Sequence, residues 1–198
     1  MNQKETQVRE PIGKAQRAAQ KHQNPVCIWI TGLPGAGKST IAVELERRLH
    51  GLGRHSYILD GDRLRAGLNR DLGYTHEART ENIRRAAEVA KLMIDAGLVV
   101  ICAFISPYRS ERRFARSLLA PGEFIEVFLD VSPQVCEKRD PKGHYARARR
   151  GEIKGFTGID GSYEKPAAPE LRLDTEQLSL DQCVEQILAF LAARAPGQ

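Results

Sequence analysis

Short apolar runs divide this chain into regularly spaced segments. They cover residues 26–30, 56–59, 98–105 and 124–129, and a weaker run covers 171–173. Runs of this length are typical of strands that are buried on both faces of a parallel sheet. The pattern therefore predicts four strands and a fifth, weaker one.

Between these runs, apolar residues recur at helical spacing. The first expected helix follows the turn after the first strand and ends at Gly51 and Gly53. Further helices are expected near 77–96, near 111–119, from Pro133 onward, and at 180–193. The residues expected to face inward from the first two are Ile41, Leu45, Leu49 and Leu52, and Ile83, Ala87, Ala90 and Ile94. Strands that alternate with helices predict a three-layer α/β fold with a parallel sheet.

Two segments follow neither period. Residues 139–160 are dense in Arg and Lys and interrupted by Gly and Pro, which predicts a long loop without a helix. Such a loop in a small domain usually has a function. Residues 1–24 contain no Leu and no aromatic side chain, so we expect a weakly ordered or surface-docked arm before a single domain at 25–198.

Polar and glycine-rich segments follow the predicted strands at 31–40, 60–65, 106–109 and 130–133. In an open parallel sheet, the carboxyl ends of the strands meet along one edge, and ligands bind in the crevice outside that edge. The sequence therefore predicts that these four segments form one binding site.

Composition narrows the class of protein only a little. The 198 residues are 41% hydrophobic and 28% charged, as in an ordinary globular domain, and the net charge of +5 suits anionic small molecules as well as nucleic acid. The four cysteines, Cys27, Cys102, Cys136 and Cys183, are far apart and are expected to be buried thiols in a reducing cytoplasm. We see neither a run long enough to span a membrane nor a signal-peptide core.

The turn after the first strand has the spacing of a phosphate-binding loop. Gly32, Gly37, Lys38 and Ser39 satisfy the pattern G-x-x-x-x-G-K-[ST] between a strand and a helix. Backbone N–H groups of such a loop surround phosphates, the lysine neutralises the outer phosphates, and the serine holds magnesium. This predicts a nucleoside triphosphate and Mg²⁺ as ligands. The other loop residues expected to contact the nucleotide are Leu33, Pro34, Gly35, Ala36 and Thr40.

The rest of the sequence favours a small-molecule kinase, because it lacks a guanine-reading N-K-x-D motif and the acidic pair of a motor ATPase. Asp60 and Asp62 follow the second strand, where carboxylates can bind magnesium or accept a proton; an Asp-Gly turn that caps a helix fits as well. Arg79 and Asn82 share a helix face that continues into an apolar stripe, which suggests a pocket, although a solvated helix start would have the same pattern.

Five segments closely resemble adenylylsulfate (APS) kinases: GLPGAGKST, LDGDRLRAGLNRDLGY, ENIRRAAEVAKLMIDAGLVVICAFISPYR, FIEVFLDVSPQVCEKRDPKGHY and GEIKGFTGIDGSYEKP. The resemblance runs from about Val26 to Leu173. It implies a P-loop NTPase or nucleoside-monophosphate-kinase-like fold with a mobile lid at about 139–160. It also implies a sulfate-activation reaction in which MgATP phosphorylates the 3′-hydroxyl of adenosine 5′-phosphosulfate (APS), giving PAPS and ADP.

The resemblance also implies roles for individual residues. Asp62 would be the catalytic carboxylate near the 3′-hydroxyl, and Arg139 would lie beside the ATP base. The residues that would contact APS are Arg65, Arg79 and Asn82 as polar groups, Tyr74 and Phe156 as rings that stack on the adenine, Ile105 and Ser106 at the end of the third strand, and Lys142 and Gly155 in the lid. Ser106 is also marked as a candidate phosphoserine. Since no base adjoins it in FISPYR, we expect it mainly to contact APS while the phosphoryl group passes directly between the two nucleotides.

The sequence departs from the family pattern at Arg63 in place of Asn, Tyr74 in place of Phe, Pro34 in place of Ser, and KGHY in place of KGLY. Two alternatives stay open: a related kinase of another small nucleotide, and a non-catalytic nucleotide-binding regulator. We expect neither a nucleic-acid nor a membrane partner, because only net charge favours nucleic acid. The resemblance further suggests a homodimer and a functional link to an ATP sulfurylase.

Overall fold

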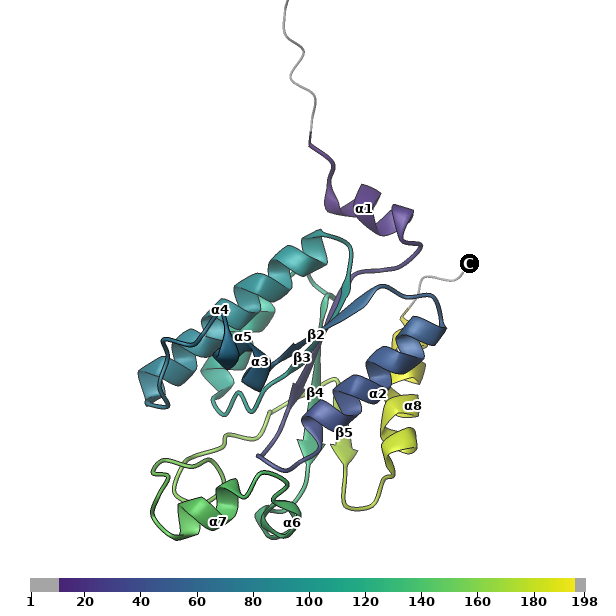
Figure 1. Cartoon of the computed structure of the whole chain (residues 1–198). Helices are drawn as coiled ribbons and strands as arrows, with labels where there is room; N and C mark the ends of the chain where they lie inside the picture. Colours follow the sequence, from purple (N-terminus) through teal and green to yellow (C-terminus); the bar gives the residue numbers. More distant parts are fainter. Residues whose placement is uncertain (1–10, 195–198) are drawn as a thin grey trace, which may run out of the picture.

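The computed structural model describes residues 11–194 and has a parallel sheet covered by helices (Figure 1). The strands are β1 (Val26–Thr31), β2 (Ser56–Asp60), β3 (Val99–Ala103), β4 (Phe124–Asp130) and β5 (Leu171–Asp174). The helices are α1 (Lys14–Gln20), α2 (Lys38–Gly51), α3 (Gly61–Ala66), α4 (His76–Asp95), α5 (Arg109–Ser117), α6 (Pro133–Arg139), α7 (His144–Arg149) and α8 (Leu180–Ala193). The strand order is β2-β3-β1-β4-β5, and every neighbouring pair is parallel.

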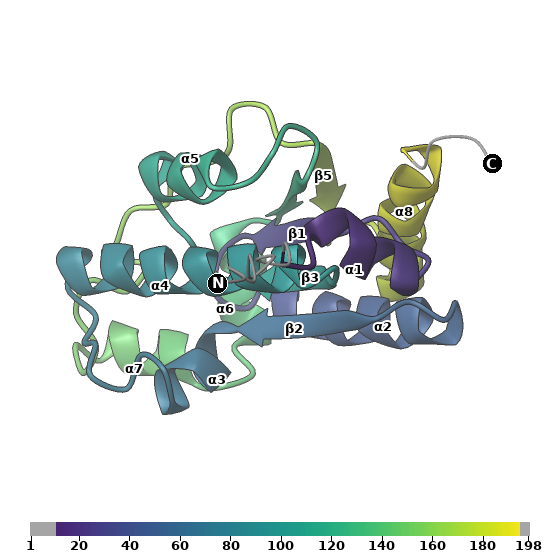
Figure 2. The same cartoon turned by 90° about the horizontal axis from the view of Figure 1, so that it is seen from above.

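The sheet separates two layers of helices, which Figure 2 shows from above. Helices α2 and α8 pack on one face with Ile28 and Ile30 of β1, and helices α4 and α5 pack on the other with Cys27 and Trp29. Successive residues of a strand point to opposite faces, so both faces of β1 are buried, as the continuous apolar run predicts. The predicted three-layer α/β fold is confirmed.

The expected strands and helices are present, with small shifts at their ends. The residues of α4 that were expected to face inward, Ile83, Ala87, Ala90 and Ile94, are buried. One expectation for α2 is wrong, because Leu52 is 63% exposed. The helix ends at Gly51, which leaves Leu52 at the cap instead of on the buried stripe. All four cysteines are buried thiols, as expected.

The expectation that residues 139–160 contain no helix is wrong. Helix α6 extends to Arg139, and the short helix α7 follows within the segment. The carboxylate of Asp140 accepts hydrogen bonds from the backbone N–H groups of Tyr145 and Ala146, at 3.1 and 3.0 Å, and so caps the first turn of α7. Tyr145 and Ala148 are both buried and lie three residues apart. Two apolar anchors suffice for a short helix but are too few for a visible period.

Residues 11–24 lie at the amino end of the strands, opposite the polar segments (Figure 1). The Gln23 amide donates to the carbonyl oxygens of Gly97 and His55, at 2.7 and 2.9 Å. Gly97 has a φ of +84°, and a Cβ there would lie 3.0 Å from the backbone of Arg17. Residues 1–10 of the predicted arm lie outside the described residues. None of the helices within residues 11–194 has both the length and the apolarity needed to cross a membrane.

Candidate active site

The loop at residues 32–37 joins β1 to α2 and depends on glycine at two positions. Gly35 has a φ of +77°, and a Cβ there would lie 2.8 Å from the carbonyl oxygen of Cys136. Gly37 has a φ of +97° and is the N-cap of α2. Left-handed backbone and close approach both favour glycine. The loop leads directly into the N-terminus of α2, where backbone N–H groups can bind an anion.

Lys38 lies folded under this loop. Its Nζ donates to the carbonyl oxygens of Gly32 and Leu33, at 2.9 and 2.7 Å. Burial of the amine lowers the pKa of Lys38 from its usual 10.5 to about 8. Desolvation disfavours the charged amine, whereas a neighbouring anion favours it. A phosphate bound in the loop would therefore raise this pKa again.

Asp60 has two contacts at the end of β2. The Ser39 hydroxyl donates to its Oδ2 at 2.7 Å, and its Oδ1 accepts the backbone N–H of Asp62 at 2.9 Å. Asp60 is thus the N-cap of α3, so the capping alternative is correct and is compatible with a site role. Hydroxyl and carboxylate oxygens suit Mg²⁺, which usually keeps several waters and binds substrate phosphates. Residues 11–194 contain no group of three His, Cys, Asp or Glu side chains able to hold a metal.

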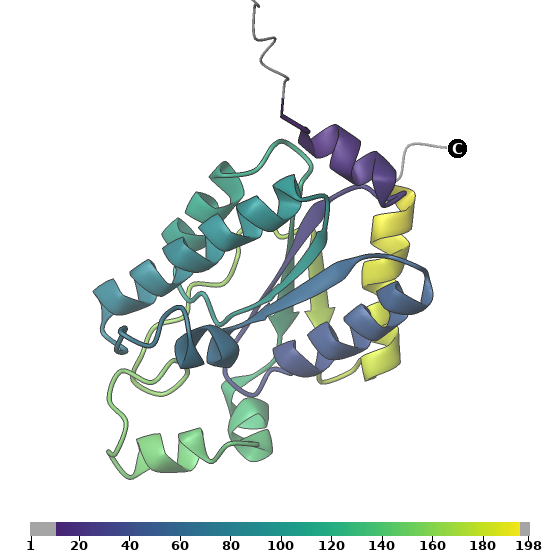
Figure 3. The ribbon, with the colours of Figure 1, turned by 45° about the horizontal axis from the view of Figure 1, so that its top comes forward.

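The structure brings Asp62 of α3 and Lys142, which are 80 residues apart, into an ion pair. Their side chains are 68% and 55% exposed. An ion pair this exposed contributes little to stability and can open at small cost. The contact therefore joins the segment between α6 and α7 to the β2 side of the site without locking it there. Figure 3 shows α6 and α7 projecting beyond the carboxyl ends of the strands.

Arg79 makes a second contact between distant segments. Its Nη2 donates to the carbonyl oxygen of Gly155 at 3.1 Å, and its Nε donates to the carbonyl oxygen of Tyr74 at 3.0 Å. The Arg65 guanidinium lies 4.5 Å from the centroid of the Tyr74 ring, which is 68% exposed. Arg65, Tyr74, Arg79 and Gly155 therefore lie together on the side of α3 and α4.

Phe156 is more enclosed than a free stacking ring would be. It is 7% exposed, and its ring packs edge-on against Tyr145, with 4.9 Å between centroids. The carboxylate of Asp160 accepts the backbone N–H groups of Gly155 and Phe156, at 2.8 and 2.6 Å. The Tyr145 hydroxyl donates to the carbonyl oxygen of Pro34 at 3.0 Å. The phosphate loop and the segment at 139–160 thus share a packed contact.

Ser106 is buried at the end of β3 and has a φ of +39°. Its hydroxyl donates to Thr31 Oγ1 at 3.0 Å and accepts from Trp29 Nε1 at 3.1 Å. Thr31 also donates to the carbonyl oxygen of Ile105 at 2.7 Å. The described partners of the Ser106 hydroxyl therefore include no carboxylate or imidazole that could act as a base.

Sequence reasoning missed two residues that hold this region. Arg112 is 2% exposed and donates to the carbonyl oxygens of Ser106 and Glu164, both at 2.6 Å, and to Glu126 at 2.7 Å. Thr175 accepts the Arg139 guanidinium at its carbonyl oxygen, at 2.6 Å. A buried arginine within the basic stretch RSERR has no distinctive local signal. Its helical spacing of three from the buried Ala115 is the one available hint.

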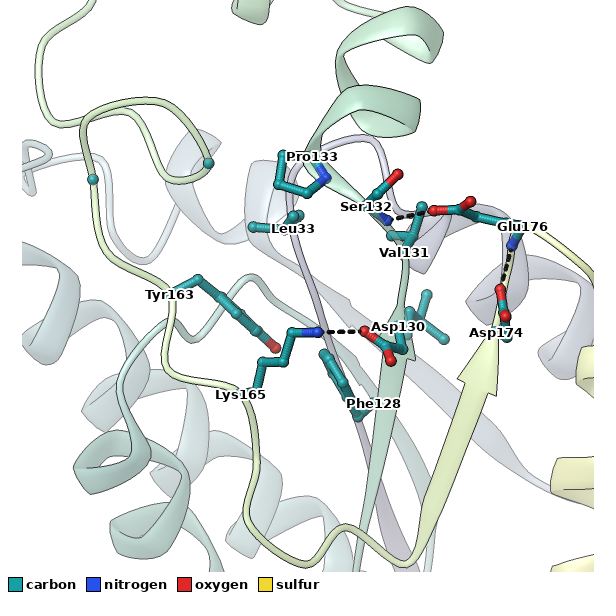
Figure 4. Close-up of a pocket in the computed structure, with 13 residues that line it drawn as sticks. Leu33, Phe128, Asp130, Val131, Ser132, Pro133, Tyr163, Lys165, Asp174 and Glu176 are labelled. Carbon is teal, nitrogen blue, oxygen red and sulfur yellow. Dashed lines mark hydrogen bonds and ion pairs between the residues drawn. The ribbon is translucent and has the colours of Figure 1, made fainter.

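A cavity of about 490 Å³ lies beside the loop, between the end of β4 and residues 158–165 (Figure 4). Leu33 and the segment 130–133, which was predicted to form part of the binding site, line it. Its charged groups already have protein partners: Lys165 pairs with Asp130 at 2.9 Å, and Asp174 and Glu176 accept backbone N–H groups. The polar groups expected to bind nucleotides lie outside this cavity, in two sets. Arg139 lies near the end of β5, because its guanidinium donates to Thr175, the residue after that strand. Asp62 lies on the β2 side of the sheet with Arg65 and Arg79.

The chain is similar to several known proteins. A family model described as adenylylsulphate kinase matches residues 24–174. An adenylyl-sulfate kinase of Marinobacter nauticus is 55% identical over 183 residues, which cover 92% of each chain. The bifunctional enzyme NodQ of a Rhizobium species is 57% identical over 187 residues, which cover 94% of this chain and 29% of NodQ.

Two solved structures are similar as well. The APS kinase CysC of Mycobacterium tuberculosis, in complex with AMPPNP and APS, has a TM-score of 0.82 and 46% identity, and the match covers 85% of this chain and 98% of that one. A hexameric APS kinase from Thiobacillus denitrificans has a TM-score of 0.67 and 33% identity, covering 90% of this chain and 31% of that one.

Proposed function

Because the chain belongs to the adenylylsulphate kinase family, we propose that it transfers the γ-phosphate of ATP to the 3′-hydroxyl of APS, giving PAPS and ADP. The observation that carries this proposal is the convergence of distant polar residues beside the phosphate loop. Lys142 reaches Asp62, and Arg79 reaches Gly155, so a second anionic ligand would meet basic groups from both sides.

On the ATP side, residues 32–40 would surround the phosphates, and Lys38 would exchange its two backbone carbonyl partners for phosphate oxygens. Arg139 would lie beside the base, held by Thr175. Ser39 and Asp60 provide oxygen atoms that suit Mg²⁺, which neutralises charge on the transferred phosphoryl group when it is bound. Pro34 has no N–H to offer a phosphate, but its carbonyl oxygen anchors Tyr145.

On the acceptor side, Asp62 would take the proton of the attacking 3′-hydroxyl. Its ion pair with Lys142 would open as the substrate enters, and Lys142 would then face the anionic substrate. The remaining groups proposed to hold APS are Arg65, Tyr74, Arg79, Asn82, Ile105, Ser106, Gly155 and Phe156. Residues 139–160 would act as the lid that excludes water, which competes with the hydroxyl as phosphoryl acceptor.

We propose that the phosphoryl group passes directly from ATP to APS. Ser106 would contact APS without acting as a nucleophile. Its hydroxyl donates its proton to Thr31 and accepts an N–H from Trp29, and neither partner is a base. A serine nucleophile needs an adjacent base, whereas direct in-line transfer needs positioning and charge neutralisation. Phosphorylation at Ser106 would then be a side event.

A coupled assay that follows ADP release tests the activity. ATP with APS should give rapid turnover, and ATP with other nucleotide acceptors, or with none, should give little. Preference for another acceptor would indicate a related kinase. Nucleotide binding with no turnover on any acceptor would indicate a regulator, and either result would refute the proposal.

The proposal includes a homodimer in the cytoplasm and a functional link to an ATP sulfurylase. A hexameric relative supports self-association, and a bifunctional relative, of which this chain matches 29%, supports a link to a second activity. Molar mass in solution, measured by light scattering at several protein concentrations, would distinguish a dimer from a monomer or a hexamer.

A further inference from the structure

Asn69 is fully buried in the turn between α3 and α4. Its Nδ2 donates to the side-chain oxygen of Asn82 at 3.0 Å and lies 3.5 Å from the backbone carbonyl oxygen of the same residue. Its Oδ1 is buried and has no hydrogen-bond partner among the described residues. An unsatisfied buried oxygen is rare and costly, so this arrangement calls for an explanation.

The neighbouring groups fix the orientation of both amides. If the Asn69 amide were reversed, its oxygen would face the backbone carbonyl oxygen of Asn82, and two acceptors would oppose each other. Nδ2 must therefore point toward Asn82. The Asn82 side-chain oxygen accepts this N–H, so the Asn82 Nδ2 must point away from Asn69.

The free end of Asn82 is therefore a hydrogen-bond donor. Within residues 11–194, its Nδ2 donates to no protein acceptor, and Asn82 lies three residues after Arg79 on the same helix face. The Arg79 guanidinium contacts the carbonyl oxygen of Gly155. Asn82 and Arg79 thus both offer N–H groups at one end of α4, as recognition of an anion requires.

We propose that Asn69 is a positioning residue that holds the Asn82 carboxamide with its N–H₂ group toward the anionic acceptor nucleotide. The proposal rests on the proposed function, because it deepens the role given there to Asn82. An unrestrained asparagine can present either its oxygen or its nitrogen to a ligand. The hydrogen bond from Asn69 excludes the orientation in which the Asn82 oxygen faces the ligand. The unpaired Asn69 oxygen is the energetic cost of this restraint.

A purely structural role would be to tie the turn at residues 67–72 to α4. That turn already has another tether, because Arg85 of α4 pairs with Asp71 at 2.7 Å and donates to the carbonyl oxygen of Leu68 at 3.2 Å. Asp71→Asn weakens this exposed tether without touching Asn82. It is therefore a matched control for a general loosening of the turn.

Two substitutions of Asn69 test the proposal. Asn69→Asp introduces an acceptor that, when ionised, draws the Asn82 N–H₂ group inward and turns the Asn82 oxygen toward the ligand. We expect the KM for APS to rise about 10- to 100-fold, with the KM for ATP unchanged. Asn69→Leu keeps the branched shape of the side chain and leaves Asn82 free to rotate, so a smaller rise is expected. This variant is used if the buried carboxylate prevents folding. Asp71→Asn should leave both KM values unchanged.

A double-substitution cycle with Asn82→Ala shows whether Asn69 acts through Asn82. Asn82→Ala should raise the KM for APS by itself, and adding Asn69→Leu should then have no further effect on it. An additive effect, or an equal rise in the KM for ATP, would overturn the positioning role. If Asn82→Ala leaves the KM for APS unchanged in an active enzyme, the role proposed for Asn82 fails and the positioning role fails with it. Absence of APS-dependent turnover in the unmodified protein would refute the proposed function itself.

Discussion

The phosphate loop and the proposed lid segment are held in place by different means in this structure. The loop at residues 32–37 depends on local backbone geometry, with glycine required at Gly35 and Gly37. The proposed lid at 139–160 depends on contacts with residues far away in the sequence, such as that of Lys142 with Asp62. The loop is therefore shaped by its own backbone, whereas the proposed lid is held by an exposed ion pair on one side and by the packed contact of Tyr145 and Phe156 on the other.

The difference suggests separate roles for the two regions, charge stabilisation for the loop and control of access for the proposed lid. Preorganised N–H groups stabilise charge at no reorganisation cost during the reaction. A lid whose link to Asp62 is an exposed ion pair can open on that side to admit nucleotides and close to exclude water. The two are not independent, because Tyr145 of the lid contacts Pro34 of the loop. Substitutions that affect one region and spare the other will show how far this division holds.

Lys38→Ala should have the largest effect, since it removes the positive charge from a preformed loop. We expect kcat to fall by about 100- to 1,000-fold while the Tm changes little, because the lysine contacts backbone carbonyls outside the core. Lys142→Ala is the comparison from the lid, and its exposed ion pair predicts a smaller loss. Activity of Lys38→Ala within a few-fold of the parent would contradict the assignment of the loop.

Phe156→Ala tests whether the lid contacts APS selectively. Loss of one base-stacking ring should weaken APS binding by about 1–3 kcal/mol and ATP binding by less. Isothermal titration with each nucleotide measures both. Because Phe156 also packs against Tyr145, equal weakening for both nucleotides would mean that the ring supports the lid without stacking on APS. Tyr74→Ala is the matched control, since that ring is exposed and should affect APS alone.

The pH dependence of nucleotide binding tests the burial of Lys38. The pKa of its amine in the free protein is lowered to about 8, and the negative charge of a bound phosphate would raise it. Below pH 8 the amine is already charged; above pH 8 binding must take up a proton. Affinity for ATP should therefore fall above pH 8, by up to about tenfold per pH unit. The Lys38→Ala variant should lack this decline in affinity. An equal decline in that variant would mean that a titratable group other than Lys38 causes it.

Ser106→Ala should have the smallest effect. Direct transfer predicts substantial turnover with a KM for APS raised a few-fold, because one contact is lost and no reaction step is removed. An obligate phosphoenzyme would leave almost no turnover. ATP with a chiral γ-phosphate gives an independent answer, since one in-line transfer inverts the configuration at phosphorus. Net retention would contradict direct transfer.

Most of the fold could be predicted from sequence. The continuous apolar runs of β1 and β3 and the regular stripe of α4 identify their elements, because burial on two faces or on one face leaves a pattern along the chain. The phosphate loop could be predicted for a similar reason: its geometry is local, and Gly37, Lys38 and Ser39 carry it in consecutive positions. The family resemblance added roles for residues outside the loop, which the experiments above test.

The tertiary structure decided what depends on distant pairs. Helix α7 forms around an Asp140 cap and two buried anchors, which no period reveals. Arg112 resembles the basic residues beside it until the fold buries it against Ser106 and Glu164. The Asn69 amide acquires its orientation from Asn82, thirteen residues later. Sequence specifies local geometry and periodic burial directly, but a hydrogen bond between distant side chains exists only once the packed core has fixed where both of them lie.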